Sequence, residues 1–358
     1  MRRRRFLFCI VGVGAGNTTR NLAILRELDS LGPCEIRVAA QGRARELLDR
    51  HYHTIPLREV SYTKSGDFSL FSIVRSNLGF PLRFWQNMQQ LRAIMINYAP
   101  DVVVADSDFY CLRPAKKLGL KLASINNSAA VVETIAREGG LPRQCRASYR
   151  FVEKTDYWLQ RRYPGMVLCP VLQEMEGLPE KFVQIPPMVR PEIEPLTEPG
   201  NEVVVLTGGS GIDTSRIDLT GLEGQYITVL GAHLEHVPSH AKQAGFSLSV
   251  MEHFRRAKVL VVQGGFSSVS EALALRVPTV VIPIANHAEQ WVNGWWVERL
   301  GAGLSCPDPA RVSDYVKEIL KDYDRYWKAA QSLSIPRDGH RVAARQLWEW
   351  ANGGASGQ

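Results

Sequence analysis

The residues best suited to chemistry follow two short β-branched runs, 259–262 and 279–282. Each run is too short for an ordinary helix and is predicted to be a buried parallel strand. The first run leads to a glycine pair at 264–265, and the second leads to a polar loop that ends in an acidic residue and a glutamine at 289–290. Ligands in open α/β sheets bind outside the carboxyl ends of strands, so we expect both pairs to face one crevice.

A helix is expected between the two runs. Ser267 or Ser268 can cap its start, Glu271 lies inside it, and Pro278 ends it. After the polar loop, residues 291–300 return to helical spacing. The stretch therefore predicts the order strand, glycine turn, helix, strand, polar loop and helix.

This stretch resembles the donor-nucleotide motif of inverting GT-B glycosyltransferases, especially the MurG-like group, which includes the N-acetylglucosaminyltransferase of peptidoglycan synthesis. The residues that carry the resemblance are Gly264, Gly265, Glu271, Pro278, Pro283, Glu289 and Gln290. The resemblance implies two doubly wound Rossmann-like α/β domains that face each other across a cleft. It also implies a nucleotide-sugar donor, with UDP as the expected nucleotide, in the second domain and a hydroxyl acceptor in the first.

Two further places extend the resemblance on the donor side. A glycine-rich turn follows the expected strand 202–206, where backbone N–H groups and a nearby helix dipole favour a phosphate. Residue 246 matches the position that supplies an apolar side chain to the base. The expected donor-binding residues are Gly208, Gly209, Ser210, Phe246, Gly264, Gly265, Ser267, Glu271, Glu289 and Gln290.

The expected roles of these residues divide the donor into three parts. The glycine and serine N–H groups would hold the diphosphate leaving group, so no metal ion and no further cofactor are expected. Glu271 is suited to the two ribose hydroxyls, because one carboxylate can accept a hydrogen bond from each. Glu289 and Gln290 are suited to the hydroxyls of the sugar.

The acceptor side is expected around the first glycine-rich turn, which follows the strand 6–11. A lone G-x-G-x-G is weak evidence for a dinucleotide, and the acidic residue expected after the second strand is missing, so we reject NAD binding. The turn resembles a Gly-x-Gly-His-x-x-Arg acceptor loop through Gly14, Gly16 and Arg20, with Asn17 in place of the histidine. An amide cannot accept a proton near pH 7, which leaves Asn17 as a hydrogen-bonding residue for the acceptor or a plain helix cap.

The candidate general bases are two carboxylates at the end of the expected strand 101–105. With the histidine absent, Asp106 or Asp108 is the remaining group that can activate an acceptor hydroxyl. The alternative is an ordinary strand-end aspartate that caps the next helix.

Aromatic residues between positions 54 and 90 bear on the nature of the acceptor. Phe68 and Phe71 stand in a Ser/Gly-rich context and are candidates for contact with a lipid-linked or apolar acceptor. Phe84 and Trp85 are expected to be core aromatics of a helix.

Composition limits the class of protein. The chain has 358 residues, of which 45% are hydrophobic and 22% charged, enough for two domains with their own cores. Its six cysteines are scattered without a C-x-x-C pair, which favours a reducing cytoplasm over a disulfide framework or a zinc site. The irregular spacing of His233, His236, His240 and His253 gives no support to a metal site.

The formal net charge is +7, and four arginines precede the first apolar run: Arg2, Arg3, Arg4 and Arg5. One interpretation is a solvated segment that precedes the first strand. The other is a contact with an anionic membrane surface, which would place the protein at the inner face of the membrane. Nucleic acid is not an expected partner, because basic and aromatic residues do not alternate along a groove-like segment. No apolar run approaches the roughly 20 residues of a membrane-spanning helix.

The proline-rich acidic stretch 187–201 is the expected boundary between domains 1–186 and 202–340. The helix in 341–358 is expected to cross back to the first domain and to end in a frayed tail. The sequence thus predicts a metal-independent, inverting glycosyltransferase. Two alternatives remain open: a nucleotide-sugar hydrolase or epimerase of the same fold, and a non-catalytic nucleotide-sugar-binding subunit.

Overall fold

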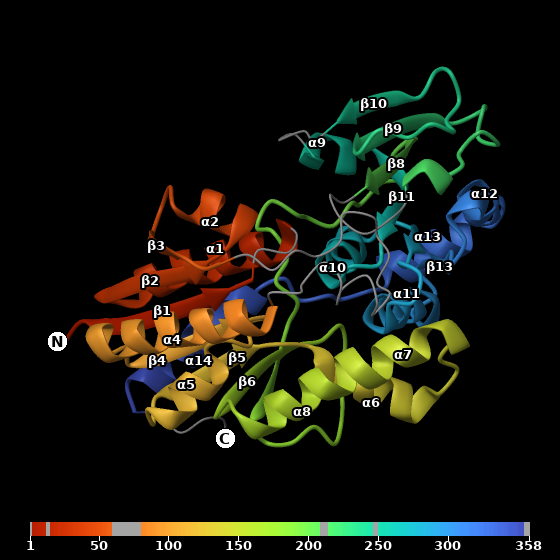
Figure 1. Ribbon diagram of the computed structural model, residues 1–358. Coiled ribbons are helices and arrows are strands. Elements are labelled where there is room, and N and C mark those ends of the chain that lie inside the picture. The colour runs from red at the N-terminus through yellow and green to blue at the C-terminus, as the bar shows by residue number, and fades with distance from the viewer. Residues whose placement is uncertain (1, 12–14, 59–79, 208–213, 246–249, 354–358) are drawn as a thin grey trace.

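The computed structural model describes residues 2–11, 15–58, 80–207, 214–245 and 250–353, which form two α/β domains, each with one parallel sheet (Figure 1). This architecture confirms the expected pair of doubly wound domains. The first sheet has the order β3-β2-β1-β4-β5-β6-β7. Its strands are β1 (Arg4–Ile10), β2 (Cys34–Ala40), β3 (His53–Pro56), β4 (Val102–Asp106), β5 (Lys121–Ile125), β6 (Met166–Pro170) and β7 (Phe182–Ile185).

The second sheet has six strands in the order β10-β9-β8-β11-β12-β13. Its strands are β8 (Glu202–Thr207), β9 (Tyr226–Gly231), β10 (Lys242–Gly245), β11 (Ala257–Gln263), β12 (Thr279–Ile282) and β13 (Gly303–Ser305). All described pairings in both sheets are parallel. The carboxyl ends of neighbouring strands therefore meet at one edge of each sheet, which is where the candidate residues lie.

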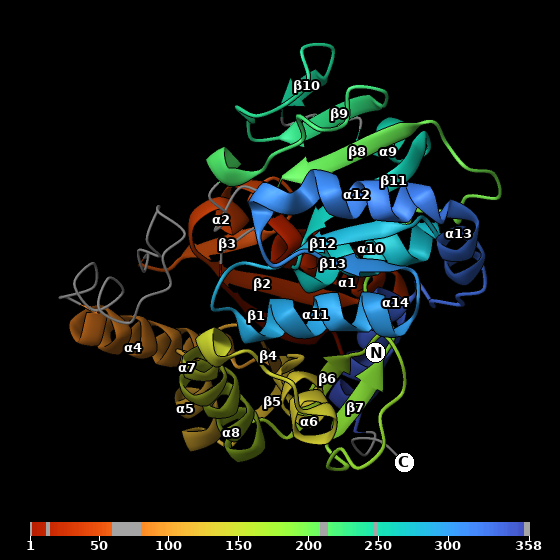
Figure 2. The ribbon, with the colours of Figure 1, turned by 90° about the vertical axis from the view of Figure 1, so that its right-hand side faces the viewer.

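Helices cover both sides of each sheet, as Figure 2 shows for the second domain. The first domain contains α1 (Ala15–Leu31), α2 (Gly42–Leu48), α4 (Phe80–Tyr98), α5 (Leu112–Lys117), α6 (Ser128–Glu138), α7 (Arg146–Ser148) and α8 (Lys154–Arg162). The second contains α9 (Val250–Phe254), α10 (Phe266–Leu275), α11 (Ala288–Arg299), α12 (Val312–Lys321) and α13 (Tyr323–Gln331). Short 3-10 turns occupy Arg143–Cys145, Thr214–Arg216 and Pro309–Arg311, and a π-helical turn, η2, occupies Tyr149–Glu153.

Strand β1 illustrates why the sheets are buried. Phe6 and Phe8 pack on one side with α1, whereas Leu7 and Cys9 pack on the other side with α4 and α5, and all four are fully buried. A strand covered on both sides is apolar at every position rather than at alternate positions. The central strands of the second sheet follow the same rule, since β8 and β11 contribute to apolar clusters on both of their sides.

The last helix, α14 (Gly339–Ala351), lies in the first domain. Its residues Ala343 and Leu347 are fully buried in the cluster that contains Phe6, and Trp348 stacks on Phe6 with ring centroids 6.4 Å apart. In the 187–201 stretch, Met188 belongs to the core of the first domain, and Val189 and Ile193 belong to the core of the second.

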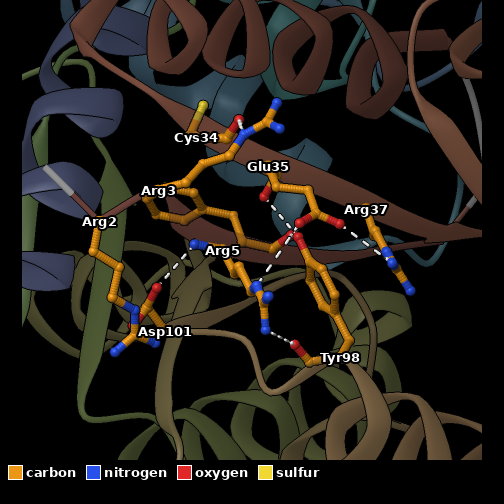
Figure 3. A network of polar contacts seen from close by, with 9 residues as sticks. Arg2, Arg3, Arg5, Cys34, Glu35, Arg37, Tyr98 and Asp101 are labelled. Atoms are coloured by element: carbon orange, nitrogen blue, oxygen red, sulfur yellow. Dashed lines mark hydrogen bonds and ion pairs between the residues drawn. The ribbon is translucent and has the colours of Figure 1, made fainter.

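The arginine run is tied to the protein rather than extended from it (Figure 3). Arg4 and Arg5 are part of β1, which corrects the expected strand start at Phe6. Arg2 pairs with Asp101 at 3.2 Å, and Arg3 donates to the carbonyl of Cys34 at 2.6 Å. Within the described residues, no helix has the length and apolarity needed to cross a bilayer.

Two local expectations were wrong. Helix α10 begins at Phe266 with Gly265 as its N-cap, so neither Ser267 nor Ser268 is the cap. Trp85 is 55% exposed on α4, whereas the neighbouring Phe84 packs on Tyr110 with ring centroids 5.0 Å apart.

Candidate functional site

The candidate donor site lies at the carboxyl ends of β11 and β12. Gly264 follows β11 and packs directly against α11: a Cβ atom on Gly264 would lie 2.8 Å from the Cβ of Gln290 and 3.0 Å from its backbone oxygen. The side chain of Asn293 donates to the carbonyl of Gly264 at 2.8 Å. The absence of a side chain at 264 therefore allows α11 to approach the end of β11, and Asn293 fixes that approach.

The start of α10 has no side-chain cap among the described residues. Gly265, its N-cap, makes no side-chain cap, and no described heavy atom lies within 4 Å of where its Cβ would be. The first N–H groups of a helix have no intrahelical partner, and the helix dipole makes this end attractive to anions. The region beside Gly265 and Ser267 thus suits a phosphate group.

Glu271 is held by a residue that the sequence analysis did not identify. Arg190 donates from Nε and Nη2 to the two carboxylate oxygens of Glu271, at 2.7 and 2.8 Å. Glu271 is 9% exposed. The one available sequence signal was that Arg190 is the only cation among the prolines and acidic residues of 186–195. A bidentate pair fixes the orientation of the carboxylate and leaves further lone pairs for other donors.

Gln290 and Glu289 lie at the start of α11. Gln290 accepts a hydrogen bond from the N–H of Ile284 at 2.9 Å, which closes the loop between β12 and α11. Glu289 accepts from the amide of Asn127 in the first domain at 3.1 Å. The side chain of Glu289, which belongs to the second domain, is therefore fixed by a residue of the first.

On the first domain, Asp106 is the centre of a closed network. It is fully buried, accepts from Nε of Arg20 at 2.8 Å, and is also bonded by Nη2 of Arg20 and the amide of Asn21. The hydroxyl of Ser107 donates to it at 3.3 Å. Ser107 has a φ of 55°, a left-handed conformation that non-glycine residues adopt at an energetic cost and that is often found at functional sites.

Arg20 links this network to the second domain. Burial lowers the pKa of its guanidinium, but the charge of Asp106, the hydrogen bond to it and the charge of Glu289 together raise it above its usual value. Arg20 therefore remains a cation at every accessible pH. Arg20 of the first domain and Glu289 of the second lie close enough to interact electrostatically across the domain boundary.

Asp108 has a different environment from Asp106. One of its oxygens accepts from the N–H of Cys111 at 2.9 Å, at the start of α5, and the other has no hydrogen-bond partner among the described residues. Burial raises the pKa of its carboxyl group to about 6. Asp108 thus performs the capping role that was the alternative for this position and also has one oxygen without a partner.

Several predicted site residues lie outside the described part of the chain: Gly14, Phe68, Phe71, Gly208, Gly209, Ser210 and Phe246. Gly16 and Asn17 belong to α1, but the side chain of Asn17 is outside the description. The structure brings Arg20, Asp106 and Glu289 into one neighbourhood and keeps Gly264, Gly265 and Gln290 together beside it.

A group of titratable side chains adjoins Glu289. One oxygen of Glu153, one of Glu289 and a ring nitrogen of His287 all lie within 4.8 Å of one another. Burial raises the pKa of Glu153 well above its usual value, and the charges of Glu289 and Asp156 raise it further. Burial lowers the pKa of His287, against the charge of Glu289. The sequence analysis did not identify Glu153 or His287.

The fold is similar to that of solved sugar-transferring enzymes. The structure described as the glycotransferase of kitacinnamycin matches 98% of this chain and 100% of that chain, with a TM-score of 0.68 and 20% sequence identity. Together with the two parallel-sheet domains, this similarity shows a GT-B fold.

Sequence comparison gives the family. The profile described as Glycosyl transferase family 1 matches residues 4–320, so the chain belongs to that family. An uncharacterized glycosyltransferase of Methanosarcina mazei is 29% identical, over 96% of this chain and 98% of the relative. The protein is a glycosyltransferase, with a sugar donor and an acceptor as its substrates.

A more distant relative has a named reaction. The UDP-N-acetylglucosamine--N-acetylmuramyl-(pentapeptide) pyrophosphoryl-undecaprenol N-acetylglucosamine transferase of Serratia proteamaculans is 25% identical over 76% of this chain and 78% of its own length.

Proposed function

We propose that this glycosyltransferase is MurG-like: it transfers a sugar from a UDP-linked donor to a hydroxyl acceptor, with inversion and without a metal ion. The main support for the proposal is the arrangement at the carboxyl end of β11. The start of α10 has no side-chain cap among the described residues and suits the diphosphate. Arg190 holds the carboxylate of Glu271 in an orientation that suits the ribose hydroxyls. The Serratia relative, whose name includes a UDP-sugar, supports the choice of nucleotide.

In this mechanism the donor domain stabilises the leaving group. As the bond to the anomeric carbon breaks, negative charge develops on the diphosphate, and the N–H groups at Gly265 and the first turn of α10 would stabilise it. Glu289 and Gln290 would hold the sugar hydroxyls, so that the anomeric carbon is presented to the first domain. Gly208, Gly209, Ser210 and Phe246 keep their proposed roles toward the phosphates and the base.

We assign the general base to Asp108 in preference to Asp106. The oxygens of Asp106 already accept from Arg20, Asn21 and Ser107, whereas one oxygen of Asp108 has no partner among the described residues. A carboxylate with a pKa of about 6 is ionised near neutral pH and is a stronger base than an ordinary aspartate. Asn17, Gly14, Gly16 and Arg20 are proposed to line the acceptor.

The acceptor is proposed to be lipid-linked or an apolar small molecule. Leu82 and Trp85 on α4 are 60% and 55% exposed, and they follow the stretch in which Phe68 and Phe71 were predicted to contact an apolar group. A peripheral position at the inner face of the membrane is part of this proposal. Because Arg2, Arg3, Arg4 and Arg5 have partners within the protein, Trp85 and Leu82 are its stronger support.

The test is a thermal-shift screen of nucleotide sugars, since ligands that bind the native state raise its stability. The expected result is stabilisation by UDP-sugars and not by other nucleotide sugars. Incubating the stabilising donor without an acceptor then separates the remaining classes. Free UDP or an epimerised donor would identify a hydrolase or an epimerase, and binding without turnover in the presence of candidate acceptors would contradict transfer.

A further inference from the structure

The N-terminus of α11 is capped by residues from the other domain. The hydroxyl oxygen of Ser148 accepts a hydrogen bond from the N–H of Ala288 at 2.9 Å. The carboxyl group of Glu153 lies at the same end of the helix, with one oxygen within 4.8 Å of an oxygen of Glu289 and of a ring nitrogen of His287. His287, which occupies the N-cap position, makes no side-chain capping bond of its own. The first N–H group of α11 is therefore satisfied from the first domain.

Apolar packing holds these two residues in place. Ile135 of α6 and Cys145 form one buried cluster with Ala288 and Val292 of α11, and Tyr149 and Trp291 pack against it. The π-helical turn Tyr149–Glu153 lies between α7 and α8 in this cluster. A π turn inserts a residue relative to an α-helix and changes which side chains share a direction, and such turns are frequent at functional sites.

We propose that Ser148 and Glu153 are positioning residues that cap α11 across the domain boundary and thereby place Glu289 and Gln290 for the donor sugar. Asn127 supports the same arrangement through its hydrogen bond to the Glu289 carboxylate. The inference rests on the proposed function only for the role of Glu289 and Gln290 toward the sugar. Sugar binding thus requires contact between the domains, whereas binding of the nucleotide alone does not.

Glu153 has titratable neighbours on two elements. They are Glu289 and His287 at the start of α11 and Asp156 of α8, with Arg20 of α1 beyond Glu289. Burial and the acidic neighbours raise the pKa of Glu153. The stability that the protonated group contributes is therefore lost as pH rises through the raised pKa. A protonated carboxyl group can accept from an N–H group, and glutamine reproduces this acceptor.

Hydrogen exchange of the peptide that covers the start of α11 tests the cap without any ligand. Ser148→Ala and Glu153→Ala are expected to speed exchange there about fivefold, the usual size of an N-cap contribution. Glu153→Gln, which keeps a neutral acceptor at this position, is expected to keep the protection of the wild type. Glu138→Gln, an exposed position on α6, is the matched control.

The same variants are then titrated with UDP and with UDP-N-acetylglucosamine as probes. Ser148→Ala and Glu153→Ala are expected to bind UDP as the wild type does and the UDP-sugar about fivefold more weakly, with Glu153→Gln restoring it. Unchanged exchange in both alanine variants, or equal exchange in Glu153→Gln and Glu153→Ala, would overturn the cap. Wild-type protein that binds neither probe would instead overturn the proposed function and leave the exchange result standing.

Discussion

Each domain contains one arginine–carboxylate pair at its candidate site, and the two pairs differ in what they leave available. Asp106 is fully buried and accepts hydrogen bonds from Arg20, Asn21 and Ser107. Glu271 is 9% exposed, and Arg190 is its one hydrogen-bonding side chain among the described contacts. The oxygens of Asp106 are therefore occupied by hydrogen bonds within the protein. The carboxylate of Glu271 is fixed in orientation but retains lone pairs that can accept from a ligand.

The two pairs also join different parts of the chain. Arg20 and Asp106 connect α1 to the end of β4 within one domain. Arg190 comes from the stretch between the domains and reaches α10. The same pair of residue types thus forms a closed network in one domain and, in the other, leaves a carboxylate that can accept from a ligand.

The largest effect is expected from Asp106→Ala. Removal of one partner of a buried pair leaves an uncompensated charge, and the free energy of unfolding should fall by about 3–5 kcal/mol. Urea denaturation followed by circular dichroism measures it. A loss below about 1 kcal/mol would mean that the network contributes little to folding, and the contrast with Glu271 would disappear.

Asp108→Asn should reduce the rate without reducing stability. Asparagine can still cap the N–H of Cys111, but it cannot take a proton, so kcat should fall on the order of 10²-fold. The wild-type rate should rise with pH through about 6, where Asp108 loses its proton, and this rise should vanish in the variant. The raised pKa means that stability from the protonated group is lost as pH rises through about 6, so the variant should be at least as stable at pH 8. Full activity in the variant would remove Asp108 from the mechanism.

Gly264→Ala tests the approach of α11 to the donor site. The new methyl group would lie 2.8 Å from the Cβ of Gln290, and the displacement should weaken donor binding by about 1–3 kcal/mol. Gly224→Ala is the matched control, because its methyl group would meet no described atom within 4 Å and Gly224 is not a proposed donor-binding residue. Equal affinities of the two variants in a calorimetric titration would show that this close approach does not matter.

The smallest effect is expected from Asp101→Asn in the arginine network at the start of β1. Arg2, its partner, is 70% exposed in its side chain, and exposed ion pairs contribute roughly 0–1 kcal/mol. The change in the free energy of unfolding should stay below about 1 kcal/mol. A larger loss of unfolding free energy would mean that this surface network stabilises the fold to a similar extent as the buried Arg20–Asp106 pair.

The sequence predicted the strands of both sheets well because parallel strands are continuous apolar runs. The predicted range of β12 agrees with the structure, and those of β4 and β8 agree to within one residue at each end. The N-cap of α10 was misplaced by two or three residues, because serine is a stronger cap signal than the Gly265 that the structure uses. Local patterns determine such elements, so local reasoning finds them.

The contacts that organise the site were not predictable in the same way. Arg190 and Glu271 are 81 residues apart, and Ser148 and Ala288 are 140 residues apart. No periodicity in either segment indicates its partner. The resemblance to a family identified Glu271 and Glu289 but not the residues that hold them, because a motif records the ligand-binding residue rather than its support.

The central claim is that Glu271, fixed by Arg190, binds the ribose of a nucleotide-sugar donor. Calorimetric titration of UDP into the wild type and Glu271→Ala tests it most directly, with Glu138→Gln as the control. We expect the wild type and the control to bind UDP alike and Glu271→Ala to bind it more weakly by about 1.5–3 kcal/mol, typical of lost hydrogen bonds to a charged group. Equal affinity of Glu271→Ala and the wild type would contradict the claim.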